Sequence, residues 1–225
     1  MLFSKRNNMK RTLQLCLLSL FFTTTGCSQS NNKTDFVSVQ TSFRHSTNKE
    51  NCNWCGASEA SENSTWHTFI APRGEPGEKL IISGTVYLSD GKTPAKDIII
   101  YVYHTNKEGI YPKKGNEKGN GKYHGYLRGW MRTDKNGKYK FETIRPAPYH
   151  SHGGEPALIH YTVQGPDYPE YWLTGIWFAD DPRVTDKYIN NVKRSGGFSN
   201  VLVLRKDENN VLRGVRNIIL EKFEK

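Results

Sequence analysis

"ALIHYTV", residues 157–163, has the alternation expected of a β-strand with two different faces. Successive side chains of a strand point to opposite sides of the sheet. One side is apolar and is expected to lie in a core: Ala157, Ile159, Tyr161 and Val163. His160 shares the opposite side with Leu158 and Thr162, and it is therefore expected to face away from that core.

Short runs of the same kind continue from Lys79 to the C-terminus: "KLIISGTVYL", "DIIIYVYH", "YLRGWMRT", "KYKFETI", "YWLTGIWF", "NVLVLRK" and "VLRGVRNIIL". β-Branched and aromatic residues dominate these runs, as is typical of strands. Turn signals between the runs are expected to close hairpins: Asp90-Gly91, Asn136-Gly137 and Asp207 to Asn210. Only residues 183–194 have the pattern of a short helix. We therefore predict an all-β protein, a single β-sandwich with long loops and at most short helices.

The N-terminus, residues 1–26, has the pattern of a secretory signal. A basic start leads into the apolar run "LQLCLLSLFF" and the small-residue segment "TTTGC". The apolar run is too short for a permanent spanning helix. Gly26-Cys27 resembles a bacterial lipobox, in which the cysteine is acylated. The expectation is an exported lipoprotein, anchored by lipid to a membrane of the bacterial cell envelope.

The remainder is expected to divide into a polar tether over residues 27–75 and the sandwich domain over residues 76–225. The tether is poor in apolar periodicity and rich in Ser, Asn and Thr. It contains Cys52 and Cys55, which could form a local structural disulfide, a redox pair or half of a zinc site. The disulfide is favoured, because a zinc site needs further ligands and the chain has no second pair of this spacing.

The charge of the chain is moderately basic. Removal of the signal takes away four basic and no acidic residues, which lowers the formal net charge from +10 to +6. The remaining basic residues are scattered among the strand-like segments, which is typical of a solvated surface. The sequence shows no nucleic-acid-binding module, so nucleic acid is not expected as a partner.

Histidines and tyrosines are concentrated in "YHSHGGEPALIHY", residues 149–161, which holds three of the seven histidines of the chain. Tyr149 follows two prolines, so its phenol projects from a stiff loop. A free phenol has a pKa of about 10 and becomes a phenolate at neutral pH only beside a strong cation. A ferric ion, which prefers hard oxygen donors, is the obvious candidate.

Four segments in unbroken order resemble the catalytic domain of the intradiol ring-cleavage dioxygenases, the catechol and protocatechuate dioxygenase superfamily: "GTVYLSDGKTPAKDIIIYVYHTNKEGIY", "LRGWMRTDKNGKYKFETIRPAPY", "EPALIHYTV" and "TGIWFADDP". The resemblance extends over about residues 80–182. It implies a β-sandwich that carries one non-haem Fe(III), held by two tyrosines and two histidines.

The resemblance also implies particular ligands. Tyr111 closes a G-x-Y segment and Tyr149 ends P-x-P-Y, so these two tyrosines are the expected catalytic phenols and iron ligands, with His160 as the matching histidine. Leu158 stands where the family has its other histidine. His152 is taken as the replacement ligand.

Alternatives to His152 stay open: His150 could replace the missing ligand, or nothing does. Glu155 stands where the family usually has an arginine that stabilises charge on the substrate. Both departures bear on whether the iron site of the family is intact in this chain.

Four further residues near the motifs have two possible interpretations. Tyr103 lies where the family often has a tryptophan, and with Trp177 it forms either an aromatic wall of the site or ordinary core. His104 and His124 are expected to be hydrogen-bonded histidines of a loop or strand end, with His124 as a further conceivable metal donor.

The activity implied by the resemblance is Fe(III)-dependent intradiol cleavage of a catechol-type aromatic diol, with insertion of O2. The chain would then be an oxidoreductase of aromatic compound catabolism. The alternative, motivated by Leu158 and Glu155, is a non-catalytic or metal-impaired sandwich with a binding or structural role at the cell envelope. A carbohydrate-surface adhesion module is a weaker third hypothesis, supported only by the expected location and the aromatic content. The fold alone does not decide among the three.

Overall fold

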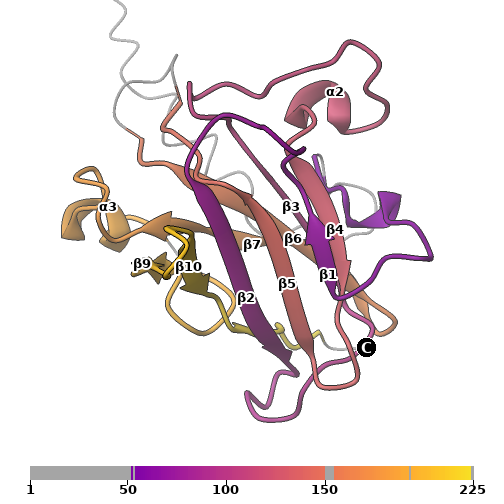
Figure 1. Ribbon diagram of the computed structural model, residues 1–225. Coiled ribbons are helices and arrows are strands. Elements are labelled where there is room, and N and C mark those ends of the chain that lie inside the picture. The colour runs from indigo at the N-terminus through magenta and orange to yellow at the C-terminus, as the bar shows by residue number, and fades with distance from the viewer. Residues whose placement is uncertain (1–51, 53, 150–154, 193, 224–225) are drawn as a thin grey trace, which may run out of the picture.

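The computed structural model describes residue 52 and residues 54–149, 155–192 and 194–223, which form two stacked β-sheets (Figure 1). Long loops connect the strands at both ends. The helical elements are a 3-10 turn, η1 (Ala57–Glu59), and two short helices, α2 (Gly121–His124) and α3 (Asp186–Asn190). The predicted all-β sandwich with at most short helices is confirmed, and α3 lies inside the segment expected to be helical.

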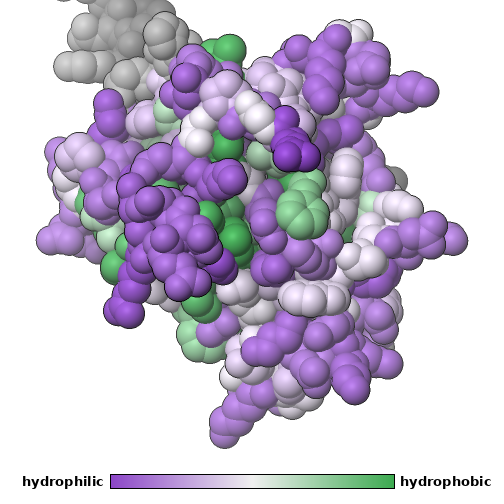
Figure 2. Space-filling view, viewed as in Figure 1, coloured by the Kyte–Doolittle hydropathy of each residue, from purple (hydrophilic) through white to green (hydrophobic). Residues whose placement is uncertain are grey.

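The first sheet has six strands. Its order is β1 (His67–Phe69), β5 (Lys138–Ile144), β2 (Lys79–Tyr87), β10 (Leu212–Val215) and β9 (Arg205–Lys206), with β11 (Ile218–Ile219) paired to the far end of β2. β2 runs antiparallel to β5 and parallel to β10. The outer face of this six-stranded sheet is solvated. Figure 2, in which the sheet faces the viewer, shows a largely hydrophilic surface with smaller hydrophobic areas.

The second sheet has five strands and carries two residues of the predicted site, Tyr103 and His160. Its order is β4 (Arg128–Arg132), β3 (Ile99–His104), β6 (Leu158–Gly165), β7 (Tyr168–Phe178) and β8 (Val201–Leu202). β3 and β6 are antiparallel neighbours, and their register sets Tyr103 directly opposite His160. Opposed side chains on one face of such a pair lie close enough to contact each other.

Two of the three hairpin predictions are wrong. The turn at Asp90-Gly91 joins β2 to β3, and the turn at Asn136-Gly137 joins β4 to β5, but in each case the two strands belong to different sheets. Only the turn after Asp207 closes a hairpin, between β9 and β10. Turn residues favour a reversal of the chain, but the packing of the two sheets decides whether the chain returns to the same sheet or crosses to the other.

The core lies between the two sheets and is built from alternate residues of each strand. The predicted apolar face of β6 is in it: Ala157, Ile159, Tyr161 and Val163 are each 3% exposed or less. From the first sheet, Ile82 and Phe141 reach the same cluster with no exposed surface. The period-two interpretation of this strand is therefore confirmed.

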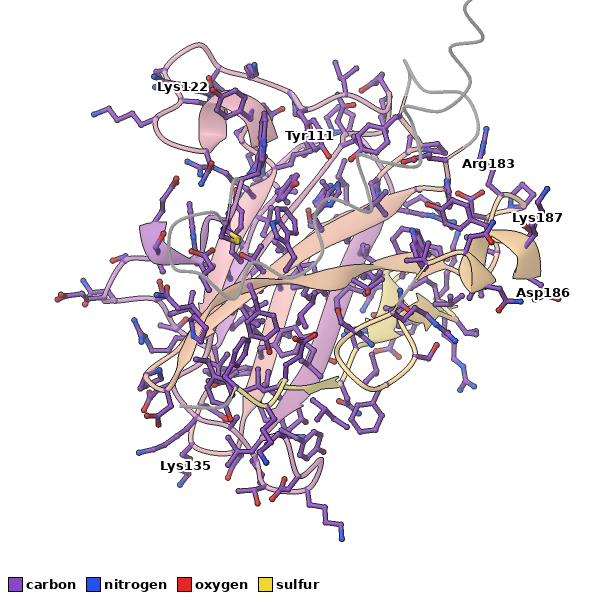
Figure 3. All side chains as sticks on the ribbon, turned by 180° about the vertical axis from the view of Figure 1, so that it is seen from behind. Tyr111, Lys122, Lys135, Arg183, Asp186 and Lys187 are labelled. Atoms are coloured by element: carbon purple, nitrogen blue, oxygen red, sulfur yellow. A yellow bond between two sulfur atoms is a disulfide. The ribbon has the colours of Figure 1, made fainter. Side chains whose placement is uncertain are left out.

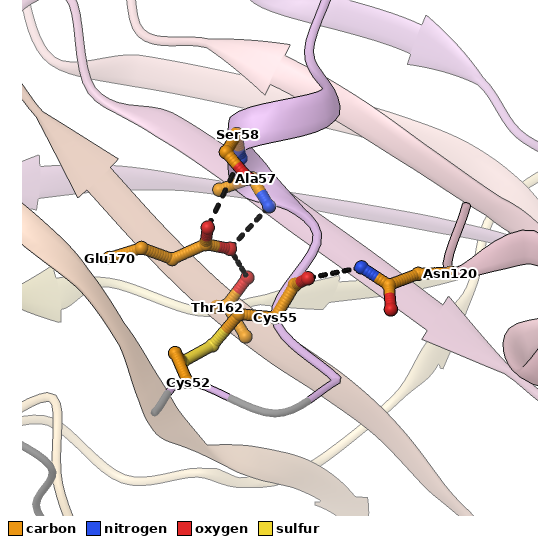
Figure 4. The surroundings of a disulfide bond; sticks show 7 residues. All are labelled: Cys52, Cys55, Ala57, Ser58, Asn120, Thr162 and Glu170. Atoms are coloured by element: carbon orange, nitrogen blue, oxygen red, sulfur yellow. Dashed lines mark hydrogen bonds between the residues drawn. A yellow bond between two sulfur atoms is a disulfide. The ribbon is translucent and has the colours of Figure 1, made fainter. Parts of the chain in front are cut away.

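The opposite face of the second sheet is covered as well, by residues 54–60, here called the strap. Glu170 of β7 accepts hydrogen bonds from the backbone N–H groups of Ala57 and Ser58, the latter at 3.2 Å. Thr162 of β6 donates its hydroxyl to the same carboxylate at 3.1 Å (Figure 4). Cys52 and Cys55 form a disulfide at the start of the strap, so the favoured interpretation of this pair is confirmed.

The ordered domain begins earlier than the expected boundary at residue 76. The strap with η1, and strand β1, both lie inside the range 27–75 that the composition assigned to a tether. They are ordered because their backbone groups pair with the sandwich: Lys140 donates to the carbonyl of Trp66, and Arg132 to that of Thr65. Polar composition alone did not distinguish such a packed segment from a tether.

The signal peptide and the acylated Cys27 lie outside the described residues and stay predictions. Within the described part of the chain, no helix has the length and apolarity to cross a membrane.

Candidate metal centre

Three of the predicted ligands converge at one point. The Tyr149 hydroxyl lies 2.6 Å from His160 Nε2 and is also hydrogen-bonded to the Tyr111 hydroxyl. The three groups come from separate elements, since Tyr111 follows β3, Tyr149 follows β5 and His160 is in β6. Figure 3 shows Tyr111 at the same end of the sandwich as Lys122 of α2, and far from Lys135 at the other end.

Asn106 links the two loops that carry the phenols. Its side-chain oxygen accepts from the backbone N–H of Glu108 at 3.0 Å and of Ile110 at 3.1 Å. Its backbone carbonyl accepts from Gly109 and also from Ala147, two residues before Tyr149, each at 3.1 Å. One residue therefore sets the path of both loops. The signal that could have revealed it is the Asn-x-x-Gly turn at 106–109, a known pattern of side-chain-to-backbone bonding.

Aromatic rings hold His160 in place. One face of its imidazole stacks on Tyr103, with ring centroids 4.4 Å apart and planes 11° apart. Trp172 meets the imidazole edge-on at 6.0 Å. Tyr103 therefore does line the site, but with Trp172 as its companion. Trp177, expected to share that wall, packs instead against Tyr188 at 5.3 Å.

Leu158 occupies the position of the missing histidine and cannot donate to a metal. It is 8% exposed and lies opposite Trp177 in the β6–β7 pair. His152 and His150, the proposed replacements, lie outside the described residues, so the fourth ligand stays a prediction. Over the described ranges, no group of three or more His, Cys, Asp or Glu side chains could hold a metal. The candidate donors are thus two phenols and one imidazole.

The candidate donors are uncharged as they stand. Burial raises the pKa of Tyr149 to about 12, with a further increase from the charge of Glu155, while the hydrogen bond from Tyr111 lowers it. Burial also raises the pKa of Tyr111 well above 10, and the nearby Tyr149 adds to that increase. Burial lowers the pKa of His160 to about 3. Two neutral phenols and one neutral imidazole thus lie together, on residues that are each half-buried.

These donors fit a ferric ion. Phenolate oxygen is a hard donor, neutral imidazole is a common iron ligand, and the two phenol protons can be replaced by one compact cation. The Tyr149 hydroxyl is hydrogen-bonded both to the Tyr111 hydroxyl and to His160 Nε2, so the candidate donors lie near one another. The set provides three protein ligands, one fewer than the family arrangement implies.

The two other histidines near the motifs are both hydrogen-bonded, as expected. His104 is fully buried; Nδ1–H donates to the Thr105 carbonyl at 2.7 Å, and Nε2 lies 2.7 Å from the Thr143 hydroxyl. His124 Nδ1 lies 2.7 Å from the Tyr101 hydroxyl. His124 stacks on Tyr103, like His160, and the two imidazoles lie on opposite faces of that ring because one face has no room for both.

Comparison with known proteins agrees with this architecture. A family model described as Dioxygenase matches residues 56–216, which is most of the chain and includes all three converging donors. The chain belongs to the intradiol ring-cleavage dioxygenase superfamily. The match begins within the strap, so this segment is part of the dioxygenase domain.

The curated relatives of this dioxygenase domain are named as protocatechuate and catechol dioxygenases. The protocatechuate 3,4-dioxygenase beta chain of Burkholderia cepacia is 30% identical over 115 residues, covering 48% of each chain. Catechol 1,2-dioxygenase 2 of Acinetobacter lwoffii is 29% identical over 140 residues, covering 56% of this chain and 49% of the relative. The chain spans about half the length of these relatives.

Solved structures share the fold of this dioxygenase domain. Catechol 1,2-dioxygenase of Acinetobacter radioresistens superimposes with a TM-score of 0.56 at 22% identity, covering 72% of this chain and 58% of that one. The dioxygenase domain of a dioxygenase and carbohydrate-binding protein fusion from Streptomyces sp. SirexAA-E gives 0.54 at 20% identity, covering 72% and 92%. At these identities the likeness establishes the fold alone.

Proposed function

We propose that this protein binds one non-haem Fe(III) through Tyr111, Tyr149 and His160, and opens the ring of a catechol-type aromatic diol with O2. The observation that carries the proposal is the convergence of the two phenol oxygens and His160 Nε2 at the Tyr149 hydroxyl. His152 remains the proposed additional ligand. The names of the curated relatives support the substrate class.

When bound, ferric iron would favour the deprotonated diol and accept electron density from it, which is the chemistry that would allow the diol to react with O2. The residues of the chain hold and orient the reactants. His160 offers the lone pair of Nε2, and its ring is fixed by the stack on Tyr103 and by the edge of Trp172. A ligand whose ring cannot rotate keeps its lone pair directed at one point.

The phenols are also suited to take up protons. Because burial raises the pKa of Tyr149 to about 12, a Tyr149 phenolate released from the cation would be a stronger base than an exposed one and would accept a proton from a diol hydroxyl. The hydrogen bond between the hydroxyls of Tyr111 and Tyr149 allows either oxygen to carry that proton.

The competing function is a sandwich protein that has kept the fold without ring cleavage. Two observations favour it: Leu158 at a ligand position, and the Glu155 carboxylate, whose charge raises the pKa of Tyr149 where the family usually has an arginine. Under this alternative the convergence of Tyr111, Tyr149 and His160 is a buried hydrogen-bonded cluster only.

Iron loading distinguishes the two functions. Purified protein reconstituted with ferric iron should bind about one equivalent and show the visible absorption band of an iron-bound phenolate. Addition of catechol should shift that band, and with O2 the product should contain both atoms of one O2 molecule. Tyr149→Phe should lose most of the band and the activity, whereas Tyr123→Phe, an exposed control on α2, should retain both. A colourless wild-type protein without stoichiometric iron would leave only the sandwich function.

A further inference from the structure

One end of the sandwich carries large apolar side chains that are exposed. Trp54 in the strap is 42% exposed and packs edge-on against Tyr123 of α2, with ring centroids 4.2 Å apart. Ile110, the residue before Tyr111, is 50% exposed. Figure 3 shows Tyr111 and Lys122 of α2 at this same end. Exposed apolar side chains in one region of a surface are typical of a binding site for a partner.

The same end of the molecule is basic. Residues 107–122 contain five lysines and two glutamates, a formal charge of +3. Three of these lysines are exposed and form no ion pair with a carboxylate in the described part of the chain: Lys113, Lys118 and Lys122. Their charges are therefore available to an anionic partner.

The carboxylates nearby already have partners of their own. Glu117 accepts hydrogen bonds from two backbone N–H groups of its own loop, one of them at 3.0 Å. Glu108 pairs with Lys107 at 3.7 Å. In the strap, Glu59 pairs with Arg128 at 2.8 Å. These contacts engage the negative charges and leave an excess of positive charge on this surface.

A run of ring contacts connects the exposed tryptophan to the segment that carries Ile110. Trp54 lies 6.0 Å from His124, and His124 stacks on Tyr103 at 3.6 Å. Tyr103 in turn lies 5.6 Å from Tyr111. The strap, α2 and the Tyr111 segment thus pack together, so their exposed side chains belong to one surface.

Hydrogen bonds fix the lysine-bearing loop to the strap. Asn120, which lies between Lys118 and Lys122, donates its side-chain N–H to the Cys55 carbonyl, next to the disulfide (Figure 4). Its backbone N–H donates to Glu59 at 2.8 Å. The loop and the strap are therefore oriented together before a partner arrives, which reduces the entropy lost on binding.

We propose that this end of the sandwich docks on an anionic lipid surface through Trp54, Ile110 and the three unpaired lysines, here called the basic patch. Tryptophan is enriched at the boundary between lipid and water, and each lysine near anionic lipid strengthens binding about fivefold. A soluble polyanion would use the lysines but would leave Trp54 and Ile110 in water, so the apolar side chains favour lipid. Docking would turn the end that carries Tyr111 toward the lipid, which goes beyond the proposed function and does not depend on it.

Quenching by brominated lipids tests the role of Trp54. The full chain with Cys27→Ser, which has no thiol at position 27 to acylate, is mixed with vesicles of equal parts phosphatidylglycerol and phosphatidylcholine with brominated acyl chains. Quenching of tryptophan emission requires near contact, so Trp54→Phe should lose most of it. Trp66→Phe should keep it and is the matched control, because Trp66 is 44% exposed and lies outside the basic patch, just before β1.

Co-sedimentation with the same vesicles, without bromine, tests the lysines. Replacement of all three lysines of the basic patch by Gln should weaken binding about hundredfold. The N-terminal segment is the same in every variant, so differences between variants report the folded domain. The control removes the same charge from exposed lysines in the turns that follow β2 and β4, at the opposite end: Lys92, Lys96 and Lys135. That variant should stay within about threefold of its parent.

Several outcomes would overturn docking on lipid. These are equal losses in the two lysine variants, quenching that Trp54→Phe retains, or a lysine effect that is the same on pure phosphatidylcholine vesicles. Binding to heparin without binding to vesicles would assign the basic patch to a soluble polyanion instead. If Trp54→Phe does not fold, the lysine variants decide, since their side chains are exposed. None of these measurements needs iron or a diol, so the proposed function is tested separately.

Discussion

The two faces of the five-stranded sheet bury different kinds of side chain on the same strands. Toward the first sheet, β3 and β6 present aliphatic side chains such as Ile100, Val102 and Ile159 to the core. Toward the strap, the same strands present Tyr103, His160 and other polar or aromatic groups. Burial alone therefore does not distinguish a hydrophobic core from a candidate functional site. The hydrogen-bonding capacity of the buried side chains distinguishes the two.

The difference between the faces has a physical basis. Aliphatic groups gain free energy from leaving water and need no partner. Polar groups lose hydrogen bonds to water when buried, so replacement partners stabilise them. The Glu170 carboxylate has such partners in the strap backbone and in Thr162 of the sheet, whereas His124 Nε2 has none among the described residues.

The largest expected effect comes from truncating the core face. Ile100→Ala removes a fully buried side chain and should lower the free energy of unfolding by about 2–5 kcal/mol. Tyr103→Phe, on the other face of the same strand, keeps the ring stack and should cost less than about 1 kcal/mol. Urea denaturation of both variants measures the contrast. Comparable losses would show that the two faces contribute to stability in the same way.

Acid should destabilise the fold through its buried histidines. Burial lowers the pKa of His104 from 6.5 to about 4. Between these values the unfolded chain binds more protons than the folded one, so this contribution is complete above pH 6.5 and is lost as the pH falls toward 4. The loss is on the order of 3 kcal/mol. Denaturation curves at several pH values measure it, and His104→Asn should flatten the pH dependence in this window. An unchanged slope in that variant would assign the acid sensitivity to other groups.

The smallest expected effect on stability concerns the two loops that carry Tyr111 and Tyr149. Asn106→Ala removes two hydrogen bonds to backbone N–H groups and should cost about 1–2 kcal/mol of stability. Because the same residue aligns both phenol loops, iron affinity should fall about tenfold, a loss greater than that of Asn136→Ala, an exposed turn control. Iron titration followed by the phenolate band is the measurement. Equal iron affinity in the two variants would remove Asn106 from the positioning of the site.

Local sequence was enough to predict part of the site. Period two in residues 157–163 correctly separated the core residues from His160. The prolines before Tyr149 predicted a stiff loop, and the structure brings its phenol to the Tyr111 hydroxyl and to His160. Asn106 and the Glu170 contact with the strap were missed, because each depends on segments that meet only in the folded chain.

What the sequence by itself determined is the alternation of the strand at residues 157–163 and the class of the fold, because these depend on side-chain chemistry and on spacing along the chain, while the three candidate donors were implied by the resemblance to the family. Only the tertiary structure decided which sheet each strand joined, how the strap buried the second face, and how Tyr103 came to lie between His160 and His124. Such arrangements depend on contacts between residues distant in sequence, and their free energy is set by the packing of the whole domain rather than by any one segment.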